Sequence, residues 1–389
     1  MKILQRYFAI SISQAVAFVL MAFLALMAFM DLTGELPSVG KNGYGIENAF
    51  LYVLILLPGH VYEVMPLAAL IGTIYTMAQF ASSSEFTIMR ASSMSTAMAA
   101  WMLFKIGVVF VIITFIFGEL ISPRTAPLAD KLKLTARGTA VSQEFRSGLW
   151  TKDIVKSDGM SGNVIGSRFF NVREVRSDGQ LMDVKFYEFD TALRLRSLIM
   201  AARATYQGNN TWRLFDVTET LFSNPALANA RGQANLENHF AQESSVVSTQ
   251  RRASLDLISE VTPKILSVSS SDPDRMSALE LAVYTRHLAE NRQETERFKI
   301  AFWKKLIDPL GIFVLMALAL PFAYLHSRSG GVSLKIFIGI MIGVSFILTN
   351  TLFSHLGLLS TWPAFLTAIA PSALFLLLAL GALWWVERH

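Results

Sequence analysis

The hydrophobic pattern divides the chain into two apolar halves separated by a polar middle. In the first half, three long apolar stretches cover residues 8–30, 49–81 and 96–122. The polar middle covers residues 124–297 and contains no apolar run of the roughly 20 residues that a membrane-crossing helix needs. The second half holds three further apolar stretches, at residues 306–325, 336–353 and 363–386. The pattern predicts an α-helical membrane protein with six spans, arranged as three plus three around an inserted domain.

The second apolar stretch is longer than one crossing requires, and helix-disturbing residues lie inside it. Pro58 and Pro66 bracket the polar residues His60 and Glu63. Because proline cannot donate the backbone hydrogen bond of a helix interior, we expect a break here. The expected arrangement is a short apolar helix near the outer membrane face, followed by a span over residues 64–80.

The polar middle has the pattern of a β domain. Residues 182–190 and 192–200 alternate apolar and polar side chains, which is the period of a half-buried strand. Turn sequences at residues 177–179 and 208–210 separate such runs. Several short strands at this spacing predict a β-sandwich or a jellyroll-like domain.

A helix is expected at each end of the polar middle. The first covers residues 128–137, and the second covers residues 277–296 with Leu281, Tyr284 and Leu288 on one face. The expected domains are a first transmembrane half, a β-rich domain with flanking helices and a second transmembrane half, at residues 1–123, 124–297 and 298–389.

Charges in the short connections predict the orientation of the chain. The side that holds the N-terminus carries Lys2, Arg6, Arg90, Arg328, Lys335 and Arg388. The short connections on the other side hold Lys41 as their one cation, against the carboxylates of Asp31, Glu35 and Glu47. Because short cytoplasmic loops are enriched in Lys and Arg, both termini are expected inside the cell and the polar domain outside.

The composition excludes several classes of protein. The chain is 53% hydrophobic and 16% charged, which is too apolar for a soluble globular protein. Its net charge of +5 is explained by cations near membrane faces, so anionic lipid is a better partner than nucleic acid. It has no cysteine, which excludes disulfides and thiolate chemistry.

No motif for nucleotide hydrolysis or catalysis is present. Gly40-Lys41-Asn42 lacks the hydroxyl and the upstream glycine of a phosphate-binding P-loop, so the chain is not expected to hydrolyse ATP itself. The motifs HExxH, GxSxG and GxGxxG are absent, and the six histidines are scattered. No catalytic residue, cofactor or metal site is predicted.

A polar segment at residues 80–94 connects the second and third spans. It contains neither Gly nor Pro, and Phe86, Met89 and Arg90 are spaced for one face of a helix that begins near Glu85. We hypothesise that a separate, energy-supplying protein binds Glu85 and these neighbours. The alternative is a solvated loop, which the spacing alone favours.

Cations gather at the outer membrane edge, against the positive-inside trend. One interpretation is a rim that binds a polyanionic lipid, with about 1 kcal/mol for each cation near the surface. The other is ordinary contact with lipid headgroups, since two of these lysines follow the interfacial residue Trp303. The set, hereafter the cationic rim, consists of Lys41, Arg124, Lys131, Lys133, Arg137, Arg297, Lys304 and Lys305.

Several motifs in order along the chain resemble the LptF/LptG permease family, and within it most resemble LptG. Arg6-Tyr7 opens the first span, GELISP occupies residues 118–123, GLWTKD residues 148–153 and RFKIAFWKKLIDPL residues 297–310. The segment before and through the polar connection is similar to the family's Pro-x-Ala-x-Leu-x-Gly and Ser-Glu patterns. Its matching residues are Pro66, Ala69, Leu70, Gly72, Ser84, Glu85, Met89, Ala91 and Ser92, with Ser93 where glycine is usual.

This resemblance implies one of two permease subunits of an ABC-type lipopolysaccharide exporter in the bacterial inner membrane. The implied partners are an LptB-like ATPase dimer, an LptF-like second permease and a periplasmic LptC-like protein. It also implies that residues 80–94 form a coupling helix with Glu85 as a contact, and that Lys133 and Arg297 lie at the mouth of a lipid cavity. The sequence departs from the family at two positions near the rim: Asp31 stands where some members carry a lysine, and Asp130 replaces a basic residue upstream of Lys133.

Two other functions remain open from the sequence. One is an envelope receptor or scaffold whose outer domain binds a protein while the spans anchor it. The other is a membrane enzyme that modifies lipid headgroups, with Glu63 and Asp308 as candidate acids, since ionisable groups at such depths are costly and usually paired.

Overall fold

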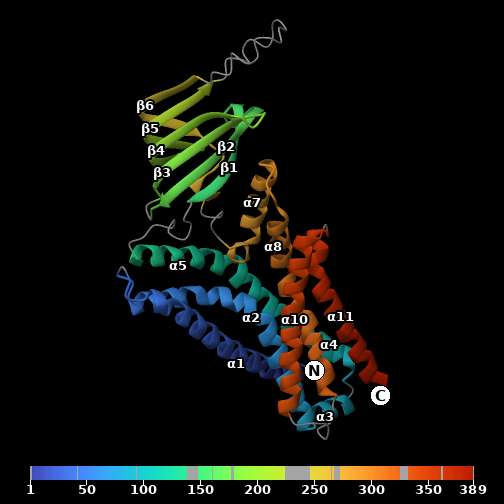
Figure 1. Cartoon of the computed structure of the whole chain (residues 1–389). Helices are drawn as coiled ribbons and strands as arrows, with labels where there is room; N and C mark the ends of the chain where they lie inside the picture. Colours follow the sequence, from blue (N-terminus) through green and yellow to red (C-terminus); the bar gives the residue numbers. More distant parts are fainter. Residues whose placement is uncertain are drawn as a thin grey trace. The chain divides into compact units, whose positions relative to one another are not determined.

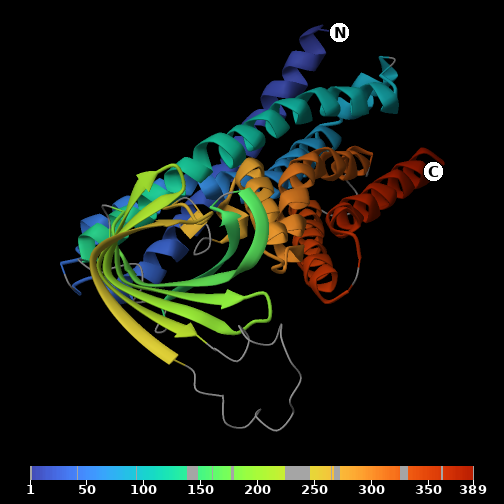
Figure 2. The same cartoon turned by 90° about the horizontal axis from the view of Figure 1, so that it is seen from above.

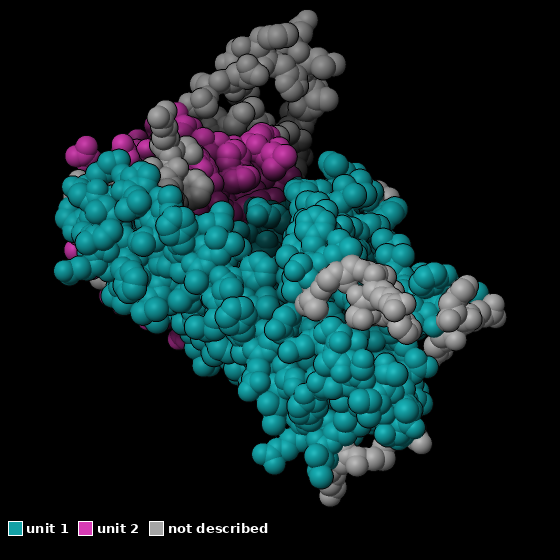
Figure 3. All heavy atoms as spheres, turned by 90° about the horizontal axis from the view of Figure 1, so that it is seen from below, with its two compact units in different colours: residues 1–133, 272–289, 293–389 teal, residues 134–271, 290–292 magenta. Residues whose placement is uncertain are grey.

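The structure is a computed structural model, and it divides into two compact units (Figure 3). The helical unit comprises residues 1–133, 272–289 and 293–389, and the β unit comprises residues 134–271 and 290–292. The residues that the structure describes are 2–41, 43–92, 94–137, 148–159, 161–176, 179–223, 246–263, 265–266, 272–324, 332–360 and 362–388.

The chain begins with a series of helices (Figure 1). They are α1 (Lys2–Glu35), α2 (Ile46–Ser82), the short α3 (Glu85–Ala91), α4 (Thr96–Phe115), the π-helical η2 (Ile116–Ile121) and α5 (Ser122–Arg137). A short 3-10 helix, η1 (Leu36–Ser38), follows α1.

The C-terminal part of the chain is also helical. Its elements are η6 (Pro273–Arg275), α7 (Ala278–Glu290), α8 (Glu296–Ile307), η7 (Asp308–Leu310), α9 (Gly311–Ala319), η8 (Leu320–Ala323), α10 (Val332–Leu359) and α11 (Ala364–Arg388). Within the described ranges, six helical segments are long and apolar enough to cross a membrane: Ile3–Ser38, Ile46–Ser82, Thr96–Lys133, Glu296–Ala323, Ser333–Leu359 and Ala364–Val386. The prediction of six spans around an inserted β domain is confirmed.

The predicted break in the second span is wrong. α2 is one continuous helix of 37 residues with Pro58 and Pro66 inside it. In a bilayer, leaving the helix would expose further backbone groups to hydrocarbon, so a proline that removes one hydrogen bond is tolerated. The third span likewise does not stop at residue 122, because α5 continues through Pro123 and Pro127.

Small residues let α1 and α2 approach each other closely. A side chain at Gly72 would bring its Cβ within 2.7 Å of the backbone of Val16. Ala68 and Ala69 of α2 are fully buried on the same stretch. Close packing through small residues is how membrane helices associate when lipid offers no hydrophobic driving force.

The β unit is a single six-stranded antiparallel sheet in which each strand pairs with its neighbours in sequence. Its strands are β1 (Leu149–Asp158), β2 (Ser161–Val175), β3 (Leu181–Asp190), β4 (Leu195–Gly208), β5 (Thr211–Ser223) and β6 (Val246–Ile258). The sheet is strongly curved (Figure 2). The architecture is consistent with the predicted jellyroll-like domain.

The core of the β unit lies around Trp212, which is fully buried. Its indole Nε1 donates to the backbone oxygen of Val261 at 2.7 Å, and its ring packs edge-on against Phe170. The predicted turn after Gly208 is confirmed, since Asn209 and Asn210 have φ of 46° and 56° between β4 and β5. The turn at residues 177–179 lies partly outside the described residues.

The predicted start of the strand at residues 192–200 is wrong by a few residues. β4 begins at Leu195, and Leu193 instead occupies the turn after β3 with a φ of 59°. The carboxylate of Asp190 accepts hydrogen bonds from the backbone of Ala192 and Arg194, which closes this turn. Local capping by an Asp side chain therefore overrides the alternating pattern.

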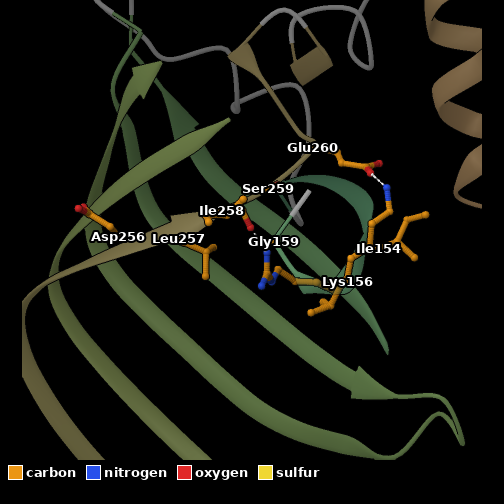
Figure 4. A pocket seen from close by; sticks show the side chains of 10 residues that line it. Ile154, Lys156, Gly159, Asp256, Leu257, Ile258, Ser259 and Glu260 are labelled. Atoms are coloured by element: carbon orange, nitrogen blue, oxygen red, sulfur yellow. Dashed lines mark hydrogen bonds and ion pairs between the residues drawn. The ribbon is translucent and has the colours of Figure 1, made fainter. Parts of the chain in front are cut away.

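Side chains connect the first strand of the sheet with the end of the last. The fully buried carboxylate of Asp153 on β1 accepts a hydrogen bond from Ser259 Oγ at 2.6 Å and from Arg168 Nη1 at 3.4 Å. Next to it, Lys156 Nζ lies 2.6 Å from Glu260 Oε1 (Figure 4). These polar contacts hold the curved sheet together where no strand pairing joins β1 to β6 in its strand order.

The Asp153 carboxyl should make the stability of the β unit depend on pH. Burial raises its pKa above the ordinary value, although Arg168 and Ser259 favour the ionised form. A raised pKa in the folded state gives a contribution that is complete below the unfolded pKa of about 3.9 and is lost as the pH rises through the folded pKa. We expect the Asp153→Asn protein not to show this decrease in stability with rising pH. Thermal unfolding midpoints measured from pH 4 to 7 test this.

Asp256 provides a control, because its pKa is shifted in the opposite direction to that of Asp153. Its hydrogen bond from Arg213 lowers the pKa of this exposed carboxyl, so its contribution is lost as the pH falls. The Asp256→Asn protein should therefore still lose stability as the pH rises, as the wild type does. An Asp153→Asn protein with the same pH profile as the wild type would contradict the assignment.

Candidate coupling surface and cationic rim

The short helix α3 is anchored to the helical unit by Phe86. This ring is 2% exposed and packs edge-on against Tyr324 with ring centroids 5.0 Å apart. Figure 1 shows α3 at the end of the helical unit where both chain termini lie. The predicted helix is therefore present, but it covers seven residues, and residues 80–82 belong to α2. Ser93 lies outside the described residues.

The carboxylate of Glu85 is held by hydrogen bonds from two sides. Tyr7, near the start of α1, donates from its hydroxyl to Glu85 Oε2 at 2.9 Å. Ser83 donates from Oγ to Glu85 Oε1 at 2.9 Å. The carboxylate remains half-buried at the first position of α3. Two segments that resemble the family, Arg6-Tyr7 and Ser84-Glu85, thus meet in space.

Tyr324 connects α3 to the end of the fourth span. The guanidinium of Arg90 lies 4.8 Å from the centroid of the Tyr324 ring, and the Tyr324 hydroxyl donates to Thr96 Oγ1 at 2.8 Å. Met89 is half-buried against the same core. α3 is therefore attached through side chains to the first and fourth spans, and through the chain itself to the second and third.

The outward face of α3 carries both apolar and polar side chains. Ile88 is 64% exposed, and Thr87 next to it is exposed too. The sequence did not indicate Ile88 as part of a binding surface, because it does not show which face of so short a helix packs inward. With Glu85 at its edge, this face can receive another protein through both a charge and an apolar contact.

The cationic rim contains residues in very different surroundings. Lys133 Nζ lies 2.6 Å from Glu35 Oε1 and 4.9 Å from the centroid of the Tyr52 ring. Lys305 is 4% exposed, and its Nζ donates to the backbone oxygen of Asp274 at 3.2 Å. These two cations are already engaged within the helical unit, so a lipid phosphate would have to displace those contacts.

The other rim cations are more accessible. Lys41, Arg124, Lys131 and Arg297 are exposed and Lys304 is half-buried. Arg297 lies 3.5 Å from Asp272 in an exposed pair, which is worth little and is readily exchanged. Arg137 is the last residue of α5, and its side chain lies outside the described residues. Whether these residues act together as a rim stays a prediction.

The candidate acids of the enzyme interpretation have different partners. His60 lies between two carboxylates, with Nε2 2.7 Å from Asp31 and Nδ1 3.1 Å from Glu63. Asp308 in η7 is 3.4 Å from Asn350 Nδ2 on α10. In the described parts of the chain no group of three or more His, Asp or Glu side chains is arranged to hold a metal ion.

The Gly-Glu pair of the GELISP segment has a structural role that the sequence did not reveal. It lies in the π-helix η2, a local irregularity that occurs often at functional positions. Both carboxylate oxygens of Glu119 accept from the backbone nitrogen of Ala278, at 3.1 and 2.9 Å, which caps the start of α7. Gly118 leaves room for the ring of Tyr62, whose hydroxyl donates to the backbone oxygen of Lys305 at 3.3 Å.

The fold and these sites define a multi-pass α-helical membrane protein with a β domain inserted between two sets of three spans. The family model described as the lipopolysaccharide export system permease LptF/LptG matches residues 6–387. The chain belongs to this family, whose members are inner-membrane permease subunits and not enzymes.

Individual relatives support the same assignment across the whole chain. The lipopolysaccharide export system permease protein LptG of Escherichia coli strain K12 is 27% identical over 382 residues, which is 98% of both chains. The protein of the same name from Haemophilus influenzae is 28% identical over 384 residues, covering 98% of this chain and 97% of its own.

Proposed function

We propose that this chain is one of the two permease subunits of an ABC-type lipopolysaccharide exporter. An LptB-like ATPase dimer supplies the energy from the cytoplasm, and an LptF-like permease completes the membrane cavity. Lipopolysaccharide leaves the outer leaflet of the inner membrane and passes, with an LptC-like protein, to a periplasmic bridge. In this arrangement both termini are cytoplasmic, and residues 124–297 form the periplasmic domain between transmembrane halves at 1–123 and 298–389.

The attachment of α3 to four spans is the observation that carries this proposal. The Tyr7–Glu85 hydrogen bond and the Phe86–Tyr324 contact connect α3 to α1 and η8. A displacement of α3 is therefore shared with the helices that would enclose a lipid, as coupling by rigid elements requires. Because the sequence contains no P-loop, the proposal assigns the work to a separate nucleotide-binding protein.

Co-purification from native membranes tests the function. We expect an ATPase and a second, similar permease to accompany the full chain, and the reconstituted complex to release lipopolysaccharide only with ATP. A chain that purifies with a periplasmic protein but no ATPase would favour the receptor or scaffold instead. Lipid headgroup turnover that is lost on replacing Glu63 or Asp308, with ATPase coupling intact, would favour the enzyme.

The pairing of Lys133 with Glu35 gives a prediction about the cationic rim. If Lys133 binds lipid phosphate, Glu35 competes with it from 2.6 Å. Removing this competitor with Glu35→Gln should tighten lipopolysaccharide binding about fivefold, which corresponds to ~1 kcal/mol. Binding is measured by titrating the detergent-solubilised complex with labelled lipopolysaccharide.

Glu47→Gln is the matched control, because it removes an exposed carboxylate from the first turn of α2. It should change the affinity much less than Glu35→Gln. An affinity that is unchanged or weaker in Glu35→Gln would show that Lys133 serves the internal ion pair and not the lipid.

A further inference from the structure

Lys105 is a cation inside the third membrane span, far from the cationic rim. It lies nine residues after the start of α4 at Thr96, which is about 14 Å along the helix axis. The residue is exposed, and its Nζ lies 5.6 Å from the centroid of the Trp101 ring, one turn nearer the start of the helix. No ion pair found among the described residues includes Lys105.

An ammonium at this depth is stabilised by an anion, and the ion pairs among the described residues do not supply one. Charged side chains within a span are costly, and they pair with other groups or extend towards the interface. The position of Nζ over Trp101 shows that the side chain extends towards the end of α4 next to α3. The phosphate of a lipid in that leaflet is the anion that such a lysine can reach.

An apolar groove begins at the same tryptophan. It has a volume of about 420 Å³, within the roughly 300–1,000 Å³ range of clefts that bind small molecules. α4, α9, η8 and α11 form its walls, and the residues used below are Ala97, Ala100, Trp101, Phe104, Phe313 and Leu383.

Stacked aromatic rings line one side of the groove. Phe104 stacks on Trp101 at 5.3 Å and on Phe313 at 4.8 Å between ring centroids. Gly107 makes this possible, since a Cβ at that position would lie 2.9 Å from Phe313 Cδ1. Because the lining residues are apolar, the groove suits a hydrocarbon chain.

The groove lies close to the membrane–water interface. Leu383 of its lining precedes Trp384 and Trp385, which are 57% and 56% exposed near the end of α11. Exposed tryptophans concentrate at the level of the lipid headgroups. An acyl chain in the groove therefore belongs to a lipid of the leaflet on the α3 side.

We propose that this groove binds an acyl chain of an anionic glycerophospholipid whose phosphate pairs with Lys105. Charge complementarity favours this lipid over an apolar helix of a partner protein, which would cover the groove and leave the ammonium without an anion. The site is separate from Glu85 and from the cationic rim, so it does not depend on the proposed export function.

Native mass spectrometry of the complete complex, purified from membranes, tests the site. The complex is titrated with phosphatidylglycerol and with phosphatidylcholine, and the retained lipids are counted. We expect the wild type to retain phosphatidylglycerol preferentially, and Lys105→Gln to lower that retention about fivefold, the effect of one cation near a lipid surface. Ala100→Phe, which fills the groove, should lower it as well.

Lys299→Gln is the matched control, because Lys299 pairs with Glu296 at 2.9 Å outside the groove and its loss should leave retention unchanged. Equal retention of the two lipids by the wild type, or full retention by Lys105→Gln, would overturn the proposal. So would a cross-link from Ala97→Cys to another chain, which is a clean probe because the sequence has no cysteine.

Discussion

Replacing Glu85 with lysine is expected to prevent the ATPase from binding and to lower lipopolysaccharide release at least tenfold. The substitution removes the acceptor of the Tyr7 and Ser83 hydrogen bonds and reverses the charge at the start of α3. Hydrogen bonds to charged groups contribute about 1.5–3 kcal/mol, and each ~1.4 kcal/mol changes an equilibrium tenfold. The measurements are co-purification of the ATPase and ATP-dependent release from reconstituted vesicles.

Glu85→Gln tests the negative charge of Glu85 separately from its role as a hydrogen-bond acceptor. Glutamine keeps an oxygen that can accept from Tyr7, so Glu85→Gln is expected to lower ATPase binding and lipopolysaccharide release less than Glu85→Lys does. Tyr7→Phe removes the donor while leaving the carboxylate, and should leave ATPase binding largely intact. If Glu85→Lys binds the ATPase and releases lipid like the wild type, then α3 is not the contact.

Replacing Gly118 with alanine is expected to destabilise the helical unit by about 1–3 kcal/mol, the usual cost of overpacking. The added Cβ would lie 2.8 Å from Tyr62 Cε2 and 3.1 Å from Cγ, in the middle of a ring that cannot move aside easily. The same π-helix carries Glu119, which caps α7, so the strain should also loosen that contact. Thermal unfolding of the detergent-solubilised complex measures the effect.

Whether Gly118→Ala lowers or raises the stability depends on the residue at position 62. In a Tyr62→Ala protein the ring is gone, and Gly118→Ala should then stabilise by about 0.5–1 kcal/mol, as alanine does in helices. Gly381→Ala is the matched control, because nothing lies within 4 Å of a Cβ at that position on α11. A Gly118→Ala protein that melts like the Gly381→Ala protein would contradict the steric explanation.

The spans and the inserted domain could be predicted because the bilayer leaves the chain little choice. A run such as residues 8–30 has no charge to expose, and backbone groups in hydrocarbon must bond within a helix. The same constraint explains the wrong prediction at Pro58 and Pro66. Rules learned from soluble helices place a break at proline, whereas lipid makes the break costlier than the lost hydrogen bond.

The partners of the candidate site residues could not be predicted, because they are distant in sequence. Tyr7 and Glu85 are 78 residues apart, and Lys133 and Glu35 are 98 apart. The family-like motifs identified Glu85 as a candidate, but they did not indicate that Tyr324, at the end of η8, packs on the same short helix. Side-chain contacts between spans depend on helix rotation and tilt, which an apolar pattern leaves open.

The most direct test of coupling through α3 is the number of ATP molecules hydrolysed per lipopolysaccharide released in a Tyr324→Leu complex. Leucine removes the hydroxyl that donates to Thr96 and the ring that contacts Phe86 and Arg90, while the outward face of α3 is unchanged. We expect the ATPase to bind as in the wild type and the ATP cost of each released lipid to rise severalfold. An unchanged ratio would contradict transmission of the ATPase movement through α3.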